Sequence, residues 1–289
     1  MKNKKILIST FILFALTLGL HFISQRSPAE HEEVYDLFLR TSITDNREFP
    51  NFCLKAAARQ EAFEKFRREG LCLLFIDNVS QAQGKEYFET IHKEHPDLIS
   101  HFEDFRQNDQ FGSPITFTYD HAPPISPKTL QYIKIAGDIQ SHFGDLNGKR
   151  ILEIGGGYGG QCAILSRLFN LKEYIIVDLP EALQLAKRYL KSLNIPNVIF
   201  KTPEELDANQ VYDLVLSNFA LSQCTKKAQK EYIDKILTHA KAAFLLCDEI
   251  SPLYGIDSYS TKELITLLKS HVVEVLEDQP SGSSILFWH

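Results

Sequence analysis

A cluster of glycines follows a short apolar run and could bind a ligand through backbone atoms. The run Arg150–Ile154 ends in Gly155-Gly156-Gly157-Tyr158-Gly159-Gly160, and an amphipathic stretch follows at 161–169. This order predicts a strand, a tight turn and a helix. Glycine permits positive φ and lets a ligand approach the backbone with no Cβ in the way. The helix would direct free N–H groups and the positive end of its dipole at a ligand above the turn.

Two acids flank this turn. Glu153 lies two residues before Gly155, and Asp178 ends the next predicted strand, Glu173–Val177, eighteen residues past Gly160. A carboxylate at Glu153 would repel a pyrophosphate but suits the cationic amino group of S-adenosylmethionine (SAM). An acid at the place of Asp178 reaches the ribose hydroxyls in both NAD and SAM folds. A glycine turn beside a solvated Asp is the alternative, and the strand–turn–helix–strand context disfavours it.

The elements that must position these residues alternate between strand and helix from 126 to 289, as a doubly wound sheet requires. Later strands are predicted at 197–200, 212–217, 242–247, 272–276 and 285–288, and helices at 128–143, 181–193, 226–240 and 261–269. The turn at 279–283 forces the last strand to return antiparallel. Such a terminal hairpin in a mostly parallel sheet marks the class I SAM-dependent methyltransferase variant of the Rossmann-like α/β fold. The NAD-binding variant usually lacks it.

The region 29–125 is predicted to be a mainly helical cap. Helices are expected at 30–40, 52–68 and 85–92, and a short apolar run at 71–76 is either a strand or a buried helical turn. A further strand is possible at 115–119, within a proline-rich connection. Ser126 is a plausible N-cap for the helix at 128–143, with Pro127 at its first position. We expect the cap to form one wall of an acceptor pocket.

Residues 1–28 are predicted to be a membrane segment. Lys2, Lys4 and Lys5 precede an apolar run at 6–23, which at the helical rise spans roughly 27 Å, just enough for a bilayer core. A single-pass anchor is favoured over a cleaved secretory signal, because the run exceeds a usual signal core and the cleavage site is poor. The excess of lysines before the run favours a cytoplasmic amino end, which would separate the rest of the chain from the usual supply of SAM. The side of the membrane stays open.

Composition excludes some classes of partner. The chain has 289 residues, a hydrophobic content of 44% and a formal net charge of −6. Without a basic cluster, nucleic acid is not expected as a partner. The five cysteines show no C-x-x-C spacing and predict neither a disulfide set nor a zinc site; they are Cys53, Cys72, Cys162, Cys224 and Cys247.

From 105 to 288 the chain resembles a family of bacterial sugar O-methyltransferases, a branch of the class I SAM-dependent enzymes. The residues that carry the resemblance are Phe105-Arg106-Gln107-Asn108-Asp109, Gly112-Ser113-Pro114, 126–134, Phe143-Gly144, 153–162, Asp178-Leu179-Pro180-Glu181 and 217–222. The resemblance implies a SAM cofactor and a sugar hydroxyl as acceptor, free, nucleotide-linked or within a glycan. The chain departs from the family pattern at Gln223, where glutamate is usual.

The resemblance also implies roles for individual residues. Glu153 would orient the methionine amino group, and the turn with Gly155, Gly157, Tyr158 and Gly159 would lie against the methionine part. Asp178 would bind the ribose hydroxyls, and Leu179 would flank the adenine. Asn218 follows the fourth strand, where side chains face the reacting centre.

Three residues are candidates for the group that accepts the hydroxyl proton. Asp248 and Glu249 end the fifth predicted strand, at the edge where acceptors dock, and Asp248 is favoured. His121, in the proline-rich connection, is the third candidate, although a lone loop histidine is more often plain surface. The two acids alone do not make an oxygen cage, so no metal is predicted.

Three functions remain open from the sequence. The first is a SAM-dependent sugar O-methyltransferase. The second is an NAD-dependent oxidoreductase, since Gly155, Gly157 and Gly160 also fit G-x-G-x-x-G; Glu153 and the terminal hairpin count against it. The third is a membrane-tethered SAM-binding protein without turnover, which Gln223 makes conceivable.

Overall fold

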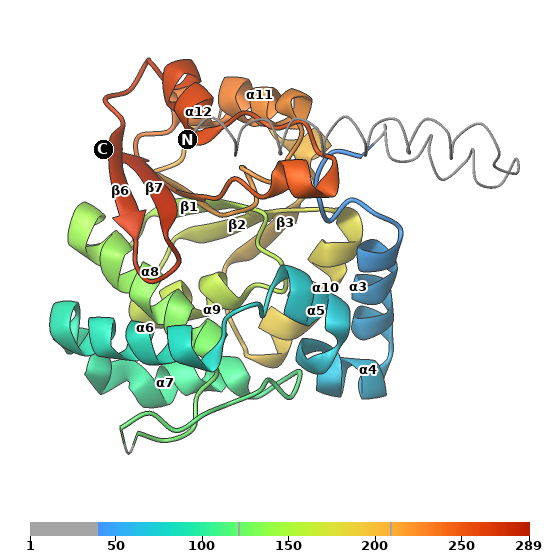
Figure 1. Cartoon of the computed structure of the whole chain (residues 1–289), viewed down its shortest axis with the longest axis vertical. Helices are drawn as coiled ribbons and strands as arrows, with labels where there is room; N and C mark the ends of the chain where they lie inside the picture. The colour runs from blue at the N-terminus through green and yellow to red at the C-terminus, as the bar shows by residue number, and fades with distance from the viewer. Residues whose placement is uncertain (1–39, 121, 209) are drawn as a thin grey trace, which may run out of the picture. The chain divides into compact units, whose positions relative to one another are not determined.

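The computed structural model describes residues 40–120, 122–208 and 210–289, and Thr41–His289 form one compact unit (Figure 1). The predicted membrane segment at 1–28 and the helix expected at 30–40 therefore lie outside the described residues, apart from Arg40. Within the described part of the chain, no helix is both long and apolar enough to cross a membrane.

The centre of the molecule is a seven-stranded sheet with the order β3-β2-β1-β4-β5-β7-β6. Its strands are β1 (Arg150–Ile154), β2 (Glu173–Val177), β3 (Val198–Lys201), β4 (Leu214–Asn218), β5 (Ala243–Cys247), β6 (Glu274–Asp278) and β7 (Ser283–Trp288). The strands from β1 to β5 pair in parallel, whereas β7 runs antiparallel to both β5 and β6. The predicted Rossmann-like sheet with its terminal antiparallel hairpin is confirmed.

The central strands are buried on both faces because helices cover each side of the sheet. The helices on one face are α8 (Pro127–Phe143), α9 (Gly160–Leu168) and α10 (Pro180–Ser192), and those on the other are α11 (Lys226–Lys235) and α12 (Thr261–Leu267) (Figure 1). Alternation along β1 sends Ile151 into the core on the α8 side, whereas Leu152 and Ile154 enter the core on the α11 side. By the same alternation, Glu153 points to the α8 side.

The N-terminal region is the expected helical cap, and it shares the core of the α8 side. Its helices are α3 (Glu48–Ala58), α4 (Gln60–Lys65), α5 (Gly70–Phe75), α6 (Gln81–Glu94) and α7 (Phe102–Arg106). Short 3₁₀ turns lie at Phe66–Arg68, Pro96–His101, Gln107–Asp109, Pro203–Glu205, Leu237–His239 and Ser251–Tyr254. In the cap, α3 packs on α10 and α6 packs on α8.

The structure corrects two sequence-based predictions in the cap and its connection, and it decides between two alternatives for a third segment. The helix predicted at 52–68 breaks at Arg59, whose backbone is extended at φ −109° and ψ 131°. The apolar run at 71–76 is helical and not a strand, as α5, which ends at Phe75. The strand expected at 115–119 is wrong: only an isolated bridge forms there, between Phe117 and Ile125.

A buried arginine ties the cap to the start of α8. Arg67 is fully buried and its guanidinium contacts Asp77 (2.7 Å) and Asp109 (2.8 Å). It also donates to Ser126 Oγ at 3.0 Å. Removing one partner from such a buried ion pair costs roughly 3–5 kcal/mol, because the other charge is left without compensation. The network therefore fixes Asp77 and Ser126 relative to each other.

Candidate functional site

The glycine turn, Gly155–Gly160, has the backbone that its sequence requires. Gly155, Gly157 and Gly159 have φ of 75°, 56° and 94°, values that residues with a Cβ rarely adopt. A Cβ at Gly155 would also overlap the Cβ of Ala220, in the loop that follows β4. The turn is thus packed against the β4 loop, and α9 begins directly after it.

Glu153 is a buried acid directly beneath this turn. Only 1% of the residue is exposed, and its carboxyl accepts a hydrogen bond from Tyr174 Oη at 2.9 Å. Burial raises the pKa of Glu153 to about 8, a rise that the Tyr174 hydrogen bond opposes. A cationic ligand group at this place would restore the ionised form.

Asn218, at the end of β4, lies beside Glu153. Its Nδ2 is 3.5 Å from Glu153 Oε1 and 3.4 Å from Gln161 Oε1. Its Oδ1 is buried and has no hydrogen-bond partner among the described residues. A buried acceptor without a partner is rare in proteins, and an ammonium donor would satisfy it. Asn218 and Glu153, both predicted from the sequence, therefore meet at one point.

Asp178 ends β2 next to the turn, as the sequence predicts. One carboxylate oxygen accepts from the Gly157 amide at 2.9 Å, and the other accepts from the Leu179 amide at 2.8 Å. Burial raises the pKa of Asp178 to about 6, although both backbone hydrogen bonds favour the charged form. The cap reaches this point too, since a Cβ on Gly157 would lie 3.3 Å from Ile76 Cδ1.

The structure separates the three candidate bases. Asp248 accepts hydrogen bonds from Gln223 Nε2 (2.7 Å) and Ser222 Oγ (3.3 Å), and burial raises its pKa. Glu249 is exposed and accepts from the Thr261 amide at 2.8 Å, at the first turn of α12. His121 lies outside the described residues. Of the two candidates that the structure describes, Asp248 is the one that is half-buried and held in position by side chains of the β4 loop.

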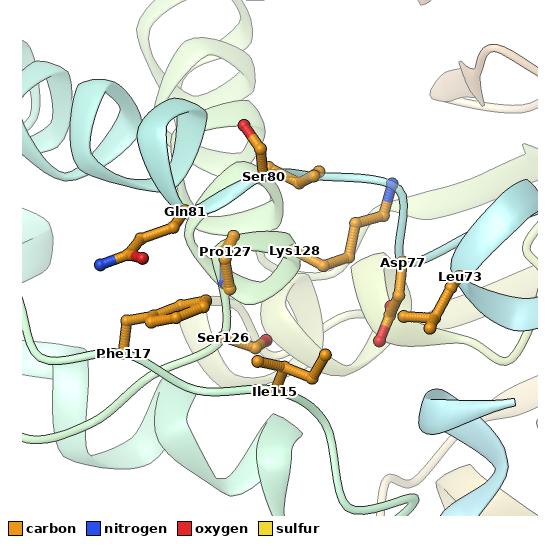
Figure 2. Close-up of a pocket in the computed structure, with 10 residues that line it drawn as sticks. Leu73, Asp77, Ser80, Gln81, Ile115, Phe117, Ser126, Pro127 and Lys128 are labelled. Carbon is orange, nitrogen blue, oxygen red and sulfur yellow. The ribbon is translucent and has the colours of Figure 1, made fainter. Parts of the chain in front are cut away.

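A cavity of about 210 Å³ lies between the cap and the start of α8 (Figure 2). We call it the α6–α8 cavity; its lining residues are Leu73, Asp77, Val79, Ser80, Gln81, Ile115, Phe117, Ser126, Pro127 and Lys128. Tyr158 of the glycine turn donates to Asp77 Oδ1 at 3.3 Å, which links the cavity to the turn. Sequence reasoning missed Asp77 and Lys128 as site residues. One indication for Lys128 was present in the sequence: it follows Ser126-Pro127, within the segment 126–134 that resembles the sugar O-methyltransferases.

No metal site is evident in the part of the chain that the structure describes, because no three His, Cys, Asp or Glu side chains gather there. The sheet order, the antiparallel β7 and the glycine turn between β1 and α9 define a class I methyltransferase fold of Rossmann-like type. Two acids lie next to the turn, Glu153 near the end of β1 and Asp178 directly after β2.

Comparison with known proteins gives relatives that carry methyltransferase names. No family model matches the chain. The arsenite methyltransferase of Mus musculus is 29% identical over 154 residues, which cover 48% of this chain and 38% of the mouse protein. The chain thus matches well under half the length of that relative.

Solved structures were also compared. The N-terminal domain of EvdMO1 with SAH bound is 15% identical, with a TM-score of 0.43 over 60% of this chain and 90% of that one. SAM-bound CalS10, an amino pentose methyltransferase from Micromonospora echinaspora, is 14% identical, with a TM-score of 0.42 over 54% of this chain and 89% of that one.

Proposed function

We propose that the protein is a SAM-dependent O-methyltransferase that methylates a sugar hydroxyl. The observation that carries the proposal is the buried carboxyl of Glu153 beneath the glycine turn, with the unpartnered Oδ1 of Asn218 beside it. Together they offer two oxygen acceptors to one ammonium group. A diphosphate at this place would meet a carboxylate, which argues against NAD.

The remaining cofactor contacts follow from the turn and from β2. The turn lies against the methionine part of SAM, and Leu179 flanks the adenine. Asp178 is already fixed by the Gly157 and Leu179 amides, so its carboxylate is held ready for the two ribose hydroxyls. The mouse relative is a methyltransferase by name, which agrees with this assignment.

For methyl transfer, the protein must position the acceptor oxygen and supply one group that accepts its proton. The sulfonium of SAM supplies an activated methyl group, and the acceptor oxygen displaces the sulfur in line as the C–O bond forms and the C–S bond breaks. The chain must hold that oxygen about 3 Å from the methyl carbon and accept the hydroxyl proton. Asp248 takes this proton in our proposal, because its carboxylate is positioned and its raised pKa makes it a stronger base than a solvated Asp.

The sugar acceptor rests on the resemblance of the motif residues between 105 and 222. Residues 1–28 would anchor the chain to a membrane, with the acceptor a glycan or activated sugar near that surface.

Calorimetry and a transfer assay on the full chain test the proposal. Titration with SAM and S-adenosylhomocysteine should give saturable heat, whereas NAD should give none. Labelled SAM with an extract of host glycans should then give a methylated sugar. Binding of NAD without binding of SAM would indicate an NAD-dependent oxidoreductase instead. Binding of SAM without transfer to any sugar would favour a SAM-binding protein that has no catalytic activity.

A further inference from the structure

The amino ends of two long helices meet at the α6–α8 cavity. Ser80 and Ser126 are the N-caps of α6 and α8, helices of 14 and 17 residues, and both serines line the cavity. Gln81 and Lys128, in the first turns of these helices, line it as well. Each helix start carries about half a positive charge from its dipole. Asp109 already accepts a hydrogen bond from the Ser126 amide at 2.7 Å and offsets part of the charge at the α8 start, so the positive potential in the cavity comes mainly from the α6 start.

Lys128 adds a buried cation that has Asp77 and Glu153 in its surroundings but forms no salt bridge among the described residues. The residue is 7% exposed, and its Nζ donates to the neutral amide oxygen of Gln131 at 2.8 Å. The same Nζ lies over the ring of Tyr132, 5.1 Å from the ring centre. Burial lowers the pKa of Lys128 to about 8, although the charges of Asp77 and Glu153 oppose that change.

Lys134, six residues further along α8, is an internal comparison. It is also buried, at 5% exposure, but its Nζ pairs with Asp138 at 2.8 Å and with Asp278 at 2.5 Å. A buried lysine normally has such partners. On the same helix, one lysine is paired within the fold and the other faces a cavity.

The rest of the cavity suits a small ring with polar groups. Asp77 is an acidic residue in the cavity wall, and its carboxylate already accepts hydrogen bonds from Arg67 and Tyr158. Apolar side chains form much of the remaining wall, and Figure 2 shows those of Leu73, Ile115, Phe117 and Pro127. Val79 also lines the cavity. The cavity of about 210 Å³ is smaller than the pockets of drug-sized ligands, which are roughly 300–1,000 Å³. Its size therefore suits one sugar unit.

We propose that the α6–α8 cavity is the acceptor subsite and that it selects a sugar bearing an oxyanion, phosphate or carboxylate, which Lys128 and the starts of α6 and α8 hold. The inference rests on the proposed function, since it names the class of sugar that this function would use. Asp77 joins the cavity to Tyr158 of the glycine turn, so a sugar bound here lies beside the cofactor cleft.

The test is calorimetry on the full chain saturated with S-adenosylhomocysteine. The probes are glucose 1-phosphate, glucuronate and glucose. One charge-assisted contact corresponds to roughly tenfold in affinity, so we expect at least one anionic probe to bind about tenfold more tightly than glucose. Raised salt should weaken that preference, because screening acts on the charge. Tight binding of the phosphate identifies a phosphorylated sugar, and tight binding of glucuronate alone identifies a uronic acid.

Two variants locate the contact. Lys128→Met removes the buried cation, and Gln81→Glu places a carboxylate at the exposed first position of α6, where a negative charge favours the helix. Each variant should bind the anionic probe about tenfold more weakly than the unaltered chain and should bind glucose with unchanged affinity. Gln60→Glu, at the exposed first position of α4 and away from the cavity, is the matched control.

Three results would overturn the inference. The first is equal binding of glucose and both anions. The second is a Gln81→Glu variant, folded by circular dichroism, that binds the anions normally. The third is a Lys128→Met variant that loses S-adenosylhomocysteine and keeps the sugar, since Lys128 would then serve the methionine carboxylate. In each case S-adenosylhomocysteine binding by the unaltered chain reports separately on the proposed function.

Discussion

The glycine turn and the α6–α8 cavity are neighbours that differ in how the chain builds them. The cofactor cleft draws most of its groups from one continuous stretch between β1 and the start of α10, and its key hydrogen bonds join Asp178 to Gly157 and Leu179. The cavity draws its walls from three separate segments, 73–81, 115–117 and 126–128. Its geometry depends on Arg67, which holds Asp77 and Ser126 together across the cap.

The charges of the two regions also differ. At the turn, Glu153 is a buried acid, and at the cavity Lys128 is a buried cation. Each acts on the charge of the other, but neither forms a salt bridge among the described residues. Each is a cost to the empty protein that a ligand of the opposite charge would remove. In our proposals the two regions would therefore serve ligands of opposite sign, a cationic cofactor and an anionic acceptor.

The largest expected effect is on the acceptor side. Asp248→Asn keeps the shape but removes the proton acceptor, so we expect kcat to fall by roughly 10²–10⁴-fold. SAM binding should be unchanged, because Asp248 is bonded to the β4 loop and not to the glycine turn. Single-turnover transfer and calorimetry would measure the two quantities. Glu249→Gln is the paired variant: if it slows transfer and Asp248→Asn does not, Glu249 is the base.

On the cofactor side, Asp178→Ala should weaken SAM binding by about 2 kcal/mol, roughly 30-fold. The variant removes the ribose acceptor and also frees the Gly157 and Leu179 amides. Asp234→Ala, at an exposed ion pair on α11, controls for the loss of an acid. If the Asp178→Ala variant and the parent protein bind SAM with equal affinity, the residue at the end of β2 does not contribute to the cofactor site.

The same difference in construction explains what the sequence could predict. Gly155, Glu153 and Asp178 lie in a short stretch where strand, turn and helix follow each other, so local spacing indicated both their structure and their proximity. Asn218 could be placed because parallel strands end at one edge of the sheet. The sequence could not show that Oδ1 of Asn218 lacks a hydrogen-bond partner among the described residues, because this depends on how the surrounding side chains pack.

The cavity could not be predicted because its residues are distant in sequence. Arg67 and Asp109 are 42 positions apart, and nothing in the spacing indicates that they form an ion pair. The break at Arg59 interrupts a periodic pattern without glycine or proline, so tertiary contacts and not propensity decide it. Lys134 differs from Lys128 through two acids: Asp138, four residues further along α8, is visible in the sequence, whereas the sequence alone does not place Asp278 of β6 beside this lysine.

A pH series sharpens the assignment of Glu153. In the empty protein its pKa is raised from 4.5 to about 8, so the carboxyl is mostly protonated at pH 7. A bound ammonium favours the ionised form, so SAM binding should release a proton and strengthen as pH rises from about 6 to 8, then level off. Calorimetry in buffers of different ionisation enthalpy would measure the released proton.

Glu153→Gln should abolish this pH dependence and weaken SAM binding about tenfold. The raised pKa also means that the parent protein loses stability as pH rises from 4.5 towards 8. The variant should lose less stability over that interval, as thermal unfolding would show. Proton release that persists in the variant would assign the titration to another group.

The smallest expected effect concerns Gln223, which stands where the sugar O-methyltransferases that the sequence resembles usually have glutamate. Its amide donates to Asp248 at 2.7 Å, so it orients the proposed base and favours the charged form. Gln223→Glu replaces this donor by a second carboxylate, which raises the pKa of Asp248 through like-charge repulsion. The lower limb of the pH–rate profile should therefore move up by about one pH unit, with the plateau rate retained. A plateau that rises by orders of magnitude would instead mean that the natural glutamine impairs turnover, and the chain would then be better described as a SAM-binding protein that has lost its base.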